Sequence, residues 1–421
     1  MAAPSRFVLD SALDAVGNTP LIRLDRIAAH KGLKCNLMAK VEYTSAGGSV
    51  KDRIAKRMVE EAEKDGIITP GKSVIIEPTS GNTGLGLAMA CAVKGYKCII
   101  CMPQKMSMEK EIQLRALGAE VVRTPTDAKL FSPVGNVGLA RRLAREIEGG
   151  VILDQYVNEH NPLAHELGTG PEIIEAIVST PSTSAHPSSG KVDVFVAAAG
   201  TGGTISGVAR ALKKTHNKDC HVVGVDPRGS NMALPTTLNR PEDSKVTYKV
   251  EGIGYAYVPE VLTRDMSEVN HWVKITDGPS FECVKLLSRL EGLLVGGSSG
   301  AALSGALQWL EESDEGKRIS QTEGMNVVVL CADGVRNYIG KDWFLDISMR
   351  SEASSLAKEI QEIRERPADP EELEACAADQ KAAEDSYSSQ LRPSWGHATK
   401  ALNGHANGHA NGHINGDVNG A

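Results

Sequence analysis

A lysine that closely follows two glycines is the first candidate for chemistry in this chain. The stretch 46–53 (AGGSVKDR) places Lys51 at the start of a predicted helix, which Ser49 is in position to cap. Because the glycines have no Cβ, the backbone there can approach a planar ligand closely. A lysine amine held in such a pocket can lose its proton and form a Schiff base with an aldehyde. The alternative is an ordinary exposed lysine near a helix start.

Two glycine-rich loops offer further polar groups. Residues 79–84 (TSGNTG) lie between a predicted strand and an apolar helix, where N–H groups and hydroxyls suit a carboxylate and Asn82 adds a side-chain donor. Residues 200–204 (GTGGT) also join a strand to a helix, and their bare N–H groups suit a phosphate. The second loop matches neither a Walker loop nor the dinucleotide fingerprint. Each loop alone could be a tight turn, but both together with Lys51 indicate pyridoxal phosphate carrying an amino acid.

The elements that must position these residues alternate between strands and helices. Helices are expected at 49–65, after the loop at 79–84, and up to Leu117 behind Ser107, which is in position to cap that helix. This alternation is typical of parallel sheets that are covered by helices on both faces. The predicted strands are 36–41, 73–77, 98–102, 120–123, 151–153, 192–198, 221–225 and 326–330.

Composition limits the class of protein. The chain has 421 residues, 41% hydrophobic and 24% charged, which is typical of a soluble globular protein large enough for two lobes. The net charge of −7 argues against nucleic acid or an anionic membrane as a partner. No apolar run approaches a membrane span, and no signal peptide precedes the core, so we expect a cytoplasmic protein. Cys98 and Cys101 have CxxC spacing, but they lie in a predicted buried strand, which favours a core role over a redox or metal role.

Beyond these residues, the sequence resembles the fold-type-II pyridoxal-phosphate enzymes, within the group of cystathionine β-synthase and cysteine synthase, from about Phe7 to Trp343. The resemblance implies an α/β fold with two lobes, each a mostly parallel sheet covered by helices, and an active site between them. It also implies a homodimer. The stretches that carry it are 16–24 (VGNTPLIRL), 48–53 (GSVKDR), 77–84 (EPTSGNTG) and 200–204 (GTGGT), and those closer to cystathionine β-synthase are 153–156 (LDQY), 161–165 (NPLAH), 250–255 (VEGIGY) and 335–338 (VRNY).

The same resemblance implies roles for individual residues. Lys51 is the Schiff-base lysine and removes the Cα proton of the substrate, and Asn82 contacts the 3′-oxygen of the cofactor. The phosphate is held by Gly200, Thr201, Gly202, Gly203 and Thr204. The amino-acid substrate is bound by Thr79, Ser80, Gly81, Thr83, Gln155, Tyr156 and Tyr255.

The chain also departs from the family pattern. The position expected to contact the pyridine nitrogen is Gly334, which has no side chain. Asp333 or Cys331 could substitute, or the nitrogen could face water. Ala256 stands where the family has an acidic residue, and Ser45 where it has an asparagine, so the standard substrate pair is in question.

The implied reaction is a β-replacement. L-serine or an O-activated serine loses its β-substituent and a thiol takes its place, as in cystathionine formation from serine and homocysteine. The alternatives are cysteine synthesis from O-acetylserine, a specialised β- or γ-elimination or replacement, and a non-catalytic relative that binds a partner. We expect small-molecule amino-acid and thiol substrates, no metal, no haem and no control by S-adenosylmethionine.

Three segments are expected along the chain. Residues 7–349 form the catalytic core, whose smaller lobe is roughly 46–150. Residues 350–390 form a charged helical extension. Residues 391–421 form a disordered, low-complexity tail of repeated Asn-Gly-His steps, where a solvated tail is favoured over metal binding.

Overall fold

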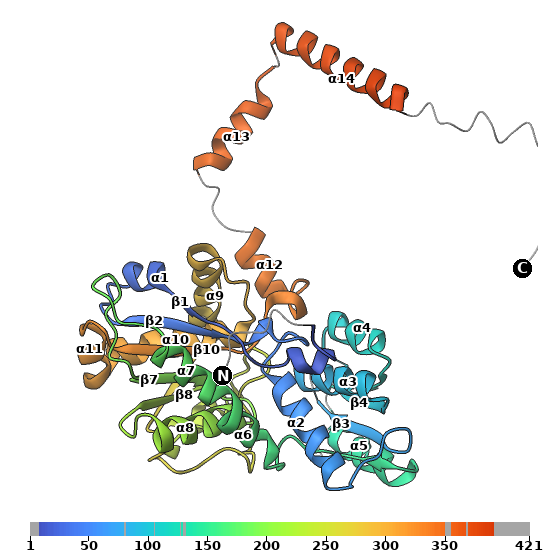
Figure 1. Cartoon of the computed structure of the whole chain (residues 1–421), viewed down its shortest axis with the longest axis vertical. Coiled ribbons are helices and arrows are strands. Elements are labelled where there is room, and N and C mark those ends of the chain that lie inside the picture. Colours follow the sequence, from blue (N-terminus) through green and yellow to red (C-terminus); the bar gives the residue numbers. More distant parts are fainter. Residues whose placement is uncertain are drawn as a thin grey trace, which may run out of the picture. The chain divides into compact units, whose positions relative to one another are not determined.

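The fold is described from a computed structural model that covers residues 8–79, 81–104, 106–126, 128, 132–349, 355–367 and 369–390. The chain divides into two compact units, Met1–Ser351 and Glu352–Ala421. The described strands all lie in the first unit, where they form two separate sheets (Figure 1). This confirms the α/β class that the alternating pattern predicts and the two lobes that the chain length and the family resemblance imply.

The larger sheet has six strands in the order β1-β2-β10-β7-β8-β9. Only β1 runs antiparallel to its neighbour, and the other pairs are parallel. Parallel pairs put the carboxyl ends of these strands along one edge, where ligands of α/β proteins bind. The strands are β1 (Leu21–Arg23), β2 (Asn36–Val41), β7 (Val194–Ala198), β8 (His221–Pro227), β9 (His271–Ile275) and β10 (Asn326–Cys331).

The smaller sheet has four parallel strands in the order β5-β4-β3-β6. Cys98 and Cys101 are both buried in β4 but belong to different hydrophobic clusters, because residues three apart on a strand face opposite sides. The buried strand predicted for this pair is confirmed. The strands are β3 (Val74–Pro78), β4 (Lys97–Pro103), β5 (Glu120–Thr124) and β6 (Gly150–Val151).

Helices cover both faces of each sheet. Side chains of β10 show how the layers form: Val327 and Val329 pack in the cluster that contains α1, α9 and α10, whereas Val328 packs with α7 and α8 on the other face. The helices of the first unit are α1 (Asp25–His30), α2 (Lys51–Lys64), α3 (Asn82–Lys94), α4 (Met108–Ala116), α5 (Asn136–Glu146), α6 (His160–Ala164), α7 (Gly170–Val178), α8 (Gly203–Thr215), α9 (Asp277–Glu291), α10 (Gly297–Glu312), α11 (Asp314–Ser320) and α12 (Asp342–Met349).

Some local predictions were wrong. Strands β1 and β9 were not predicted, and the strand expected at 151–153 is reduced to β6. Ser49 is not the N-cap of α2: the helix begins at Lys51, and the Ser49 hydroxyl accepts the Lys51 N–H two residues on, at 3.2 Å. Ser107 is the N-cap residue of α4, but its hydroxyl donates to the Asn337 carbonyl at 3.4 Å instead of capping the helix.

The second unit contains two helices, α13 (Ser355–Glu365) and α14 (Pro370–Gln390). Every side chain described between residues 356 and 386 is exposed. No helix in the described ranges is both long and apolar enough to cross a bilayer. The tail predicted at 391–421 lies outside the described residues.

Candidate active site

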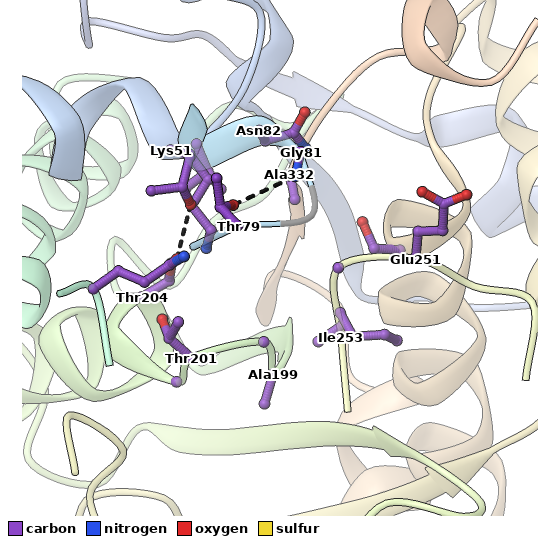
Figure 2. A pocket seen from close by; sticks show the side chains of 18 of the residues that line it. Lys51, Thr79, Gly81, Asn82, Ala199, Thr201, Thr204, Glu251, Ile253 and Ala332 are labelled. Atoms are coloured by element: carbon purple, nitrogen blue, oxygen red, sulfur yellow. Dashed lines mark hydrogen bonds between the residues drawn. The ribbon is translucent and has the colours of Figure 1, made fainter. Parts of the chain in front are cut away.

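A cavity lies between the two sheets, at the carboxyl ends of β3, β7 and β10. Loops that follow these strands supply its walls, as expected for a parallel α/β fold. We call it the inner cavity. Figure 2 shows Lys51, Thr79 and Asn82 on one side of it and Thr201 and Ala199 on the other.

Lys51 enters the cavity from the first position of α2. The loop before it is fixed to the end of β10, because the Val50 N–H donates to the Ala332 carbonyl at 2.8 Å. The Asp52 carboxylate accepts the Gly47 N–H at 2.9 Å, which closes the glycine turn. Desolvation lowers the pKa of Lys51 from 10.5 to about 8, although the Asp333 carboxylate opposes this. The amine is therefore much closer to its neutral, nucleophilic form at physiological pH than an exposed lysine.

The loop between β3 and α3 faces Gln155. The Thr83 hydroxyl donates to Gln155 Oε1 at 2.8 Å, and both side chains are buried. In β3, just before the loop, the carboxyl group of Glu77 accepts hydrogen bonds from the backbone N–H groups of Asp154 and Gln155, each at 3.2 Å. This buried carboxyl group thereby holds Gln155 against Thr83.

Asn82 is oriented by two neighbours. Its amide nitrogen donates to Asp333 Oδ2 at 2.7 Å, and its carbonyl oxygen accepts from Asn337 at 2.8 Å. Asp333 Oδ2 also accepts the Tyr338 hydroxyl at 2.6 Å. Burial raises the pKa of Asp333, while the bonds from Tyr338 and Asn82 favour its ionised form.

The loop between β7 and α8 has the form of an anion cradle. Gly202 takes φ +86°, a left-handed value that favours glycine, and a Cβ at Gly200 would collide with the Gly252 carbonyl. The hydroxyls of Thr201 and Thr204 both line the cavity at the N-terminus of this 13-residue helix. Backbone N–H groups at a helix N-terminus favour a bound anion such as phosphate.

Two buried side chains orient the hydroxyls of this loop. Asn161 Nδ2 donates to Thr201 Oγ1 at 3.0 Å and to the Gln155 carbonyl at 2.7 Å, so it joins the two walls. His165 Nε2 lies 3.1 Å from Thr204 Oγ1, and burial lowers the pKa of His165 well below its usual value. The imidazole is therefore neutral, and its tautomer sets the direction of the hydrogen bond with the Thr204 hydroxyl.

The structure brings most of the residues predicted from the sequence to this cavity. Ser80 lies outside the described residues. Gly203, Tyr156 and Gly334 do not line the inner cavity; the Tyr156 hydroxyl instead lies 3.3 Å from that of Tyr255. The predicted residues that do line it are Lys51, Thr79, Gly81, Asn82, Thr83, Gln155, Gly200, Thr201, Gly202, Thr204 and Tyr255.

Several lining residues were not predicted as site residues. Lys110 and Glu251 form an ion pair across the cavity wall, and Ser298 contributes a hydroxyl from the start of α10. Glu251 lies inside the stretch 250–255 that carries the resemblance. Ser298 lies in the glycine-rich stretch 296–300 (GGSSG) at the start of α10, which was an available signal. Lys110 stands in no such stretch, so chain pattern alone does not mark it.

Comparison with known proteins identifies close relatives. The sequence model of the family described as "Pyridoxal-phosphate dependent enzyme" matches residues 12–331. The cystathionine β-synthase of Rattus norvegicus is 49% identical over 355 residues, which cover 83% of this chain and 59% of that protein. The Saccharomyces cerevisiae cystathionine β-synthase is 47% identical over 331 residues, which cover 79% of this chain and 62% of the yeast protein. This chain therefore spans about three fifths of the length of these relatives.

Solved structures show the same fold. The crystal structure of O-ureido-L-serine synthase aligns with a TM-score of 0.69 and 31% identity over 84% of this chain and 100% of that one. A hydrogen sulfide-producing enzyme from Fusobacterium nucleatum aligns with a TM-score of 0.66 and 34% identity over 79% of this chain and 100% of its own.

Proposed function

Because the chain belongs to the pyridoxal-phosphate-dependent enzymes, we propose that it replaces the β-substituent of L-serine, or of an O-activated serine, with a thiol. The favoured form is cystathionine synthesis from serine and homocysteine, supported by 49% identity to the rat cystathionine β-synthase. One observation carries the proposal: a single cavity joins Lys51 to two glycine-rich loops from two different sheets.

The cavity fits pyridoxal phosphate on structural grounds. The loop at Gly200–Thr204 leaves no room for a Cβ at Gly200 and presents a helix N-terminus with two hydroxyls, which suits the phosphate. The pKa of Lys51, about 8, suits an amine that must attack an aldehyde. When bound, the cofactor supplies that aldehyde and an electron-accepting ring.

The residues around Lys51 have separable tasks. In its unprotonated form, the Lys51 amine can take the Cα proton of the substrate. Desolvation makes this form accessible, because it lowers the pKa of Lys51 to about 8. N–H groups and hydroxyls of the Thr79–Thr83 loop, with the Gln155 amide, can hold the substrate carboxylate. His165 and Asn161 keep the Thr204 and Thr201 hydroxyls oriented.

A second candidate is replacement on an O-activated serine with a smaller nucleophile. It is supported by the fold similarity to O-ureido-L-serine synthase and to the hydrogen sulfide-producing enzyme. The absence of a side chain at Gly334, where the family resemblance places a hydroxyl, also fits a specialised reaction.

The visible absorption spectrum of the purified protein tests the proposal. We expect a cofactor band that shifts on addition of L-serine and returns on addition of homocysteine, with cystathionine as the product. A shift with O-acetylserine alone would favour the second candidate. The absence of any cofactor band after reconstitution would contradict both.

Lys51→Ala should abolish turnover and the spectral response while the fold persists, since the reacting amine is lost. Lys64→Ala is the matched control, because Lys64 lies at the other end of α2 with 74% of its side chain exposed. Turnover by Lys51→Ala equal to that of the control would contradict the role of Lys51.

We also propose, from the family resemblance, that the protein acts as a homodimer in the cytoplasm. Sedimentation equilibrium of the full chain tests the dimer, and a monomer at micromolar concentration would contradict it.

A further inference from the structure

A second, outer cavity adjoins the inner one. The two share a wall made by the loop between β8 and β9, where Glu251, Gly252, Ile253 and Tyr255 line both. Figure 2 shows Glu251 and Ile253 on the side of the inner cavity away from Lys51. A molecule that moves from the outer to the inner cavity must therefore pass this loop.

The shared wall carries three charges in contact. The Glu251 carboxylate is paired with the ammonium of Lys110 through one oxygen and with that of Lys341, at 2.8 Å, through the other. Lys110 is 3% exposed, Glu251 18% and Lys341 25%. Within this triad, two ammonium groups face one carboxylate.

These groups belong to different parts of the fold. Lys110 lies on α4 of the smaller lobe, whereas Glu251 belongs to the larger lobe and Lys341 directly precedes α12. The Lys110 side chain also passes over the loop at Thr79–Thr83, since a Cβ at Gly81 would lie 3.0 Å from Lys110 Cε. The triad therefore lies beside the loop that we propose holds the carboxylate of the first substrate.

The carboxylate of the triad is ionised. Burial opposes the charge of Glu251, but the two lysines overcome this and hold its pKa below the ordinary value. A partly buried group of one anion and two cations can exchange its internal ion pairs for equivalent pairs with a zwitterion. The net charge of the group then stays the same, because the zwitterion brings one charge of each sign, and each of its charges gains a partner of opposite sign.

We propose that Lys110, Glu251 and Lys341 form the subsite that binds the charged end of a zwitterionic thiol, the second substrate. This inference rests on the proposed β-replacement. The α-carboxylate of the thiol pairs with the lysines and its ammonium with Glu251, and the Lys110–Glu251 pair opens as it binds. The subsite selects amino-acid thiols over hydrosulfide, which has neither charged group at its end.

The test compares two nucleophiles in the same enzyme. With L-serine as first substrate, Lys341→Gln should raise the KM for homocysteine by roughly tenfold or more, the usual result of losing a charge-assisted hydrogen bond. The KM for hydrosulfide and that for serine should stay unchanged. Lys94→Gln is the matched control, because it removes an ion pair to Glu63 of similar length, 2.7 Å, and similar exposure, 24%.

Glu251 provides a second variant of the triad. Glu251→Gln should also raise the KM for homocysteine selectively, and it preserves the shape of the side chain if Lys341→Gln proves unstable. Equal KM values in variants and wild type, or equal changes for both nucleophiles, would overturn the subsite. So would a wild-type enzyme that uses hydrosulfide but not homocysteine. A wild-type enzyme that uses no thiol at all would instead contradict the proposed function.

Discussion

Glu77 contacts no reacting group, yet its carboxyl group fixes Gln155. Burial raises the pKa of Glu77 from 4.5 to about 8. The folded protein therefore holds this proton more tightly than the unfolded chain does. For a carboxyl group with a raised pKa, the free energy of unfolding falls as the pH rises through the window from about 4.5 to about 8.

The variant Glu77→Gln should remove this contribution, because an amide does not titrate. We expect its melting temperature to fall less than that of the wild type between about pH 5 and about pH 8. Thermal unfolding at a series of pH values measures the difference. Glu146→Gln, at a side chain that is 60% exposed, provides the control. Parallel profiles for Glu77→Gln and the wild type would show that Glu77 does not titrate in this range.

Sequence reasoning found the residues whose roles depend on their chain neighbours. Lys51 and the two glycine-rich loops were predictable because each stands where a strand meets a helix. Lys110 and Glu251 were not, since 141 positions separate them and only the folded chain brings them together. Their residue types are common on any surface, and their pairing is visible only in the folded chain.

At the level of elements, a buried ion network anchors the helix that carries Lys51. Arg53, in the first turn of α2, pairs with Glu42 at 2.6 Å and with Glu172 of α7 at 2.7 Å. Lys40 of β2 adds a bond to Glu172 at 2.7 Å. Although burial opposes its charge, these partners lower the pKa of Glu172 to about 2. The network thus ties α2 to β2 and α7.

Arg53→Met should destabilise the protein by about 3–5 kcal/mol, because it leaves the fully buried Glu42 carboxylate without its cation. Urea unfolding measures the loss. Arg57→Met, on the same helix, removes a partly exposed pair to Glu61 and should cost less than about 1 kcal/mol. Similar losses in the two variants would show that the network does not anchor α2.

The elements themselves were predicted unevenly, for physical reasons. Strands β2 and β10 are mostly apolar and buried on both faces, and the sequence shows them clearly. Strand β1 has only three residues at a sheet edge, and β9 mixes polar residues with apolar ones after a long irregular segment. Ser49 was misread as a cap because its hydroxyl can satisfy a nearby N–H in a turn as well as at a helix start.

At the scale of the whole molecule, the chain separates into a unit with large cores and a unit without one. The residues of the four buried clusters all precede residue 344, within Met1–Ser351. Composition suggested this division, because the residues after 350 are charged and then repetitive. The exact boundaries at 349 and 390 stay a prediction.

A chain that ends after Ser351 should keep the melting temperature and the KM for serine of the full chain. Burial of apolar surface supplies most of the free energy of folding, and the described side chains from 356 to 386 bury almost none. Exposed apolar side chains such as Leu356, Ile360 and Ile363 on α13 contribute little while they face water. Calorimetry and initial-rate kinetics on both chains measure the effect. A drop of several degrees in the shorter chain would mean that residues after 351 stabilise the core through contacts that their exposure does not reveal.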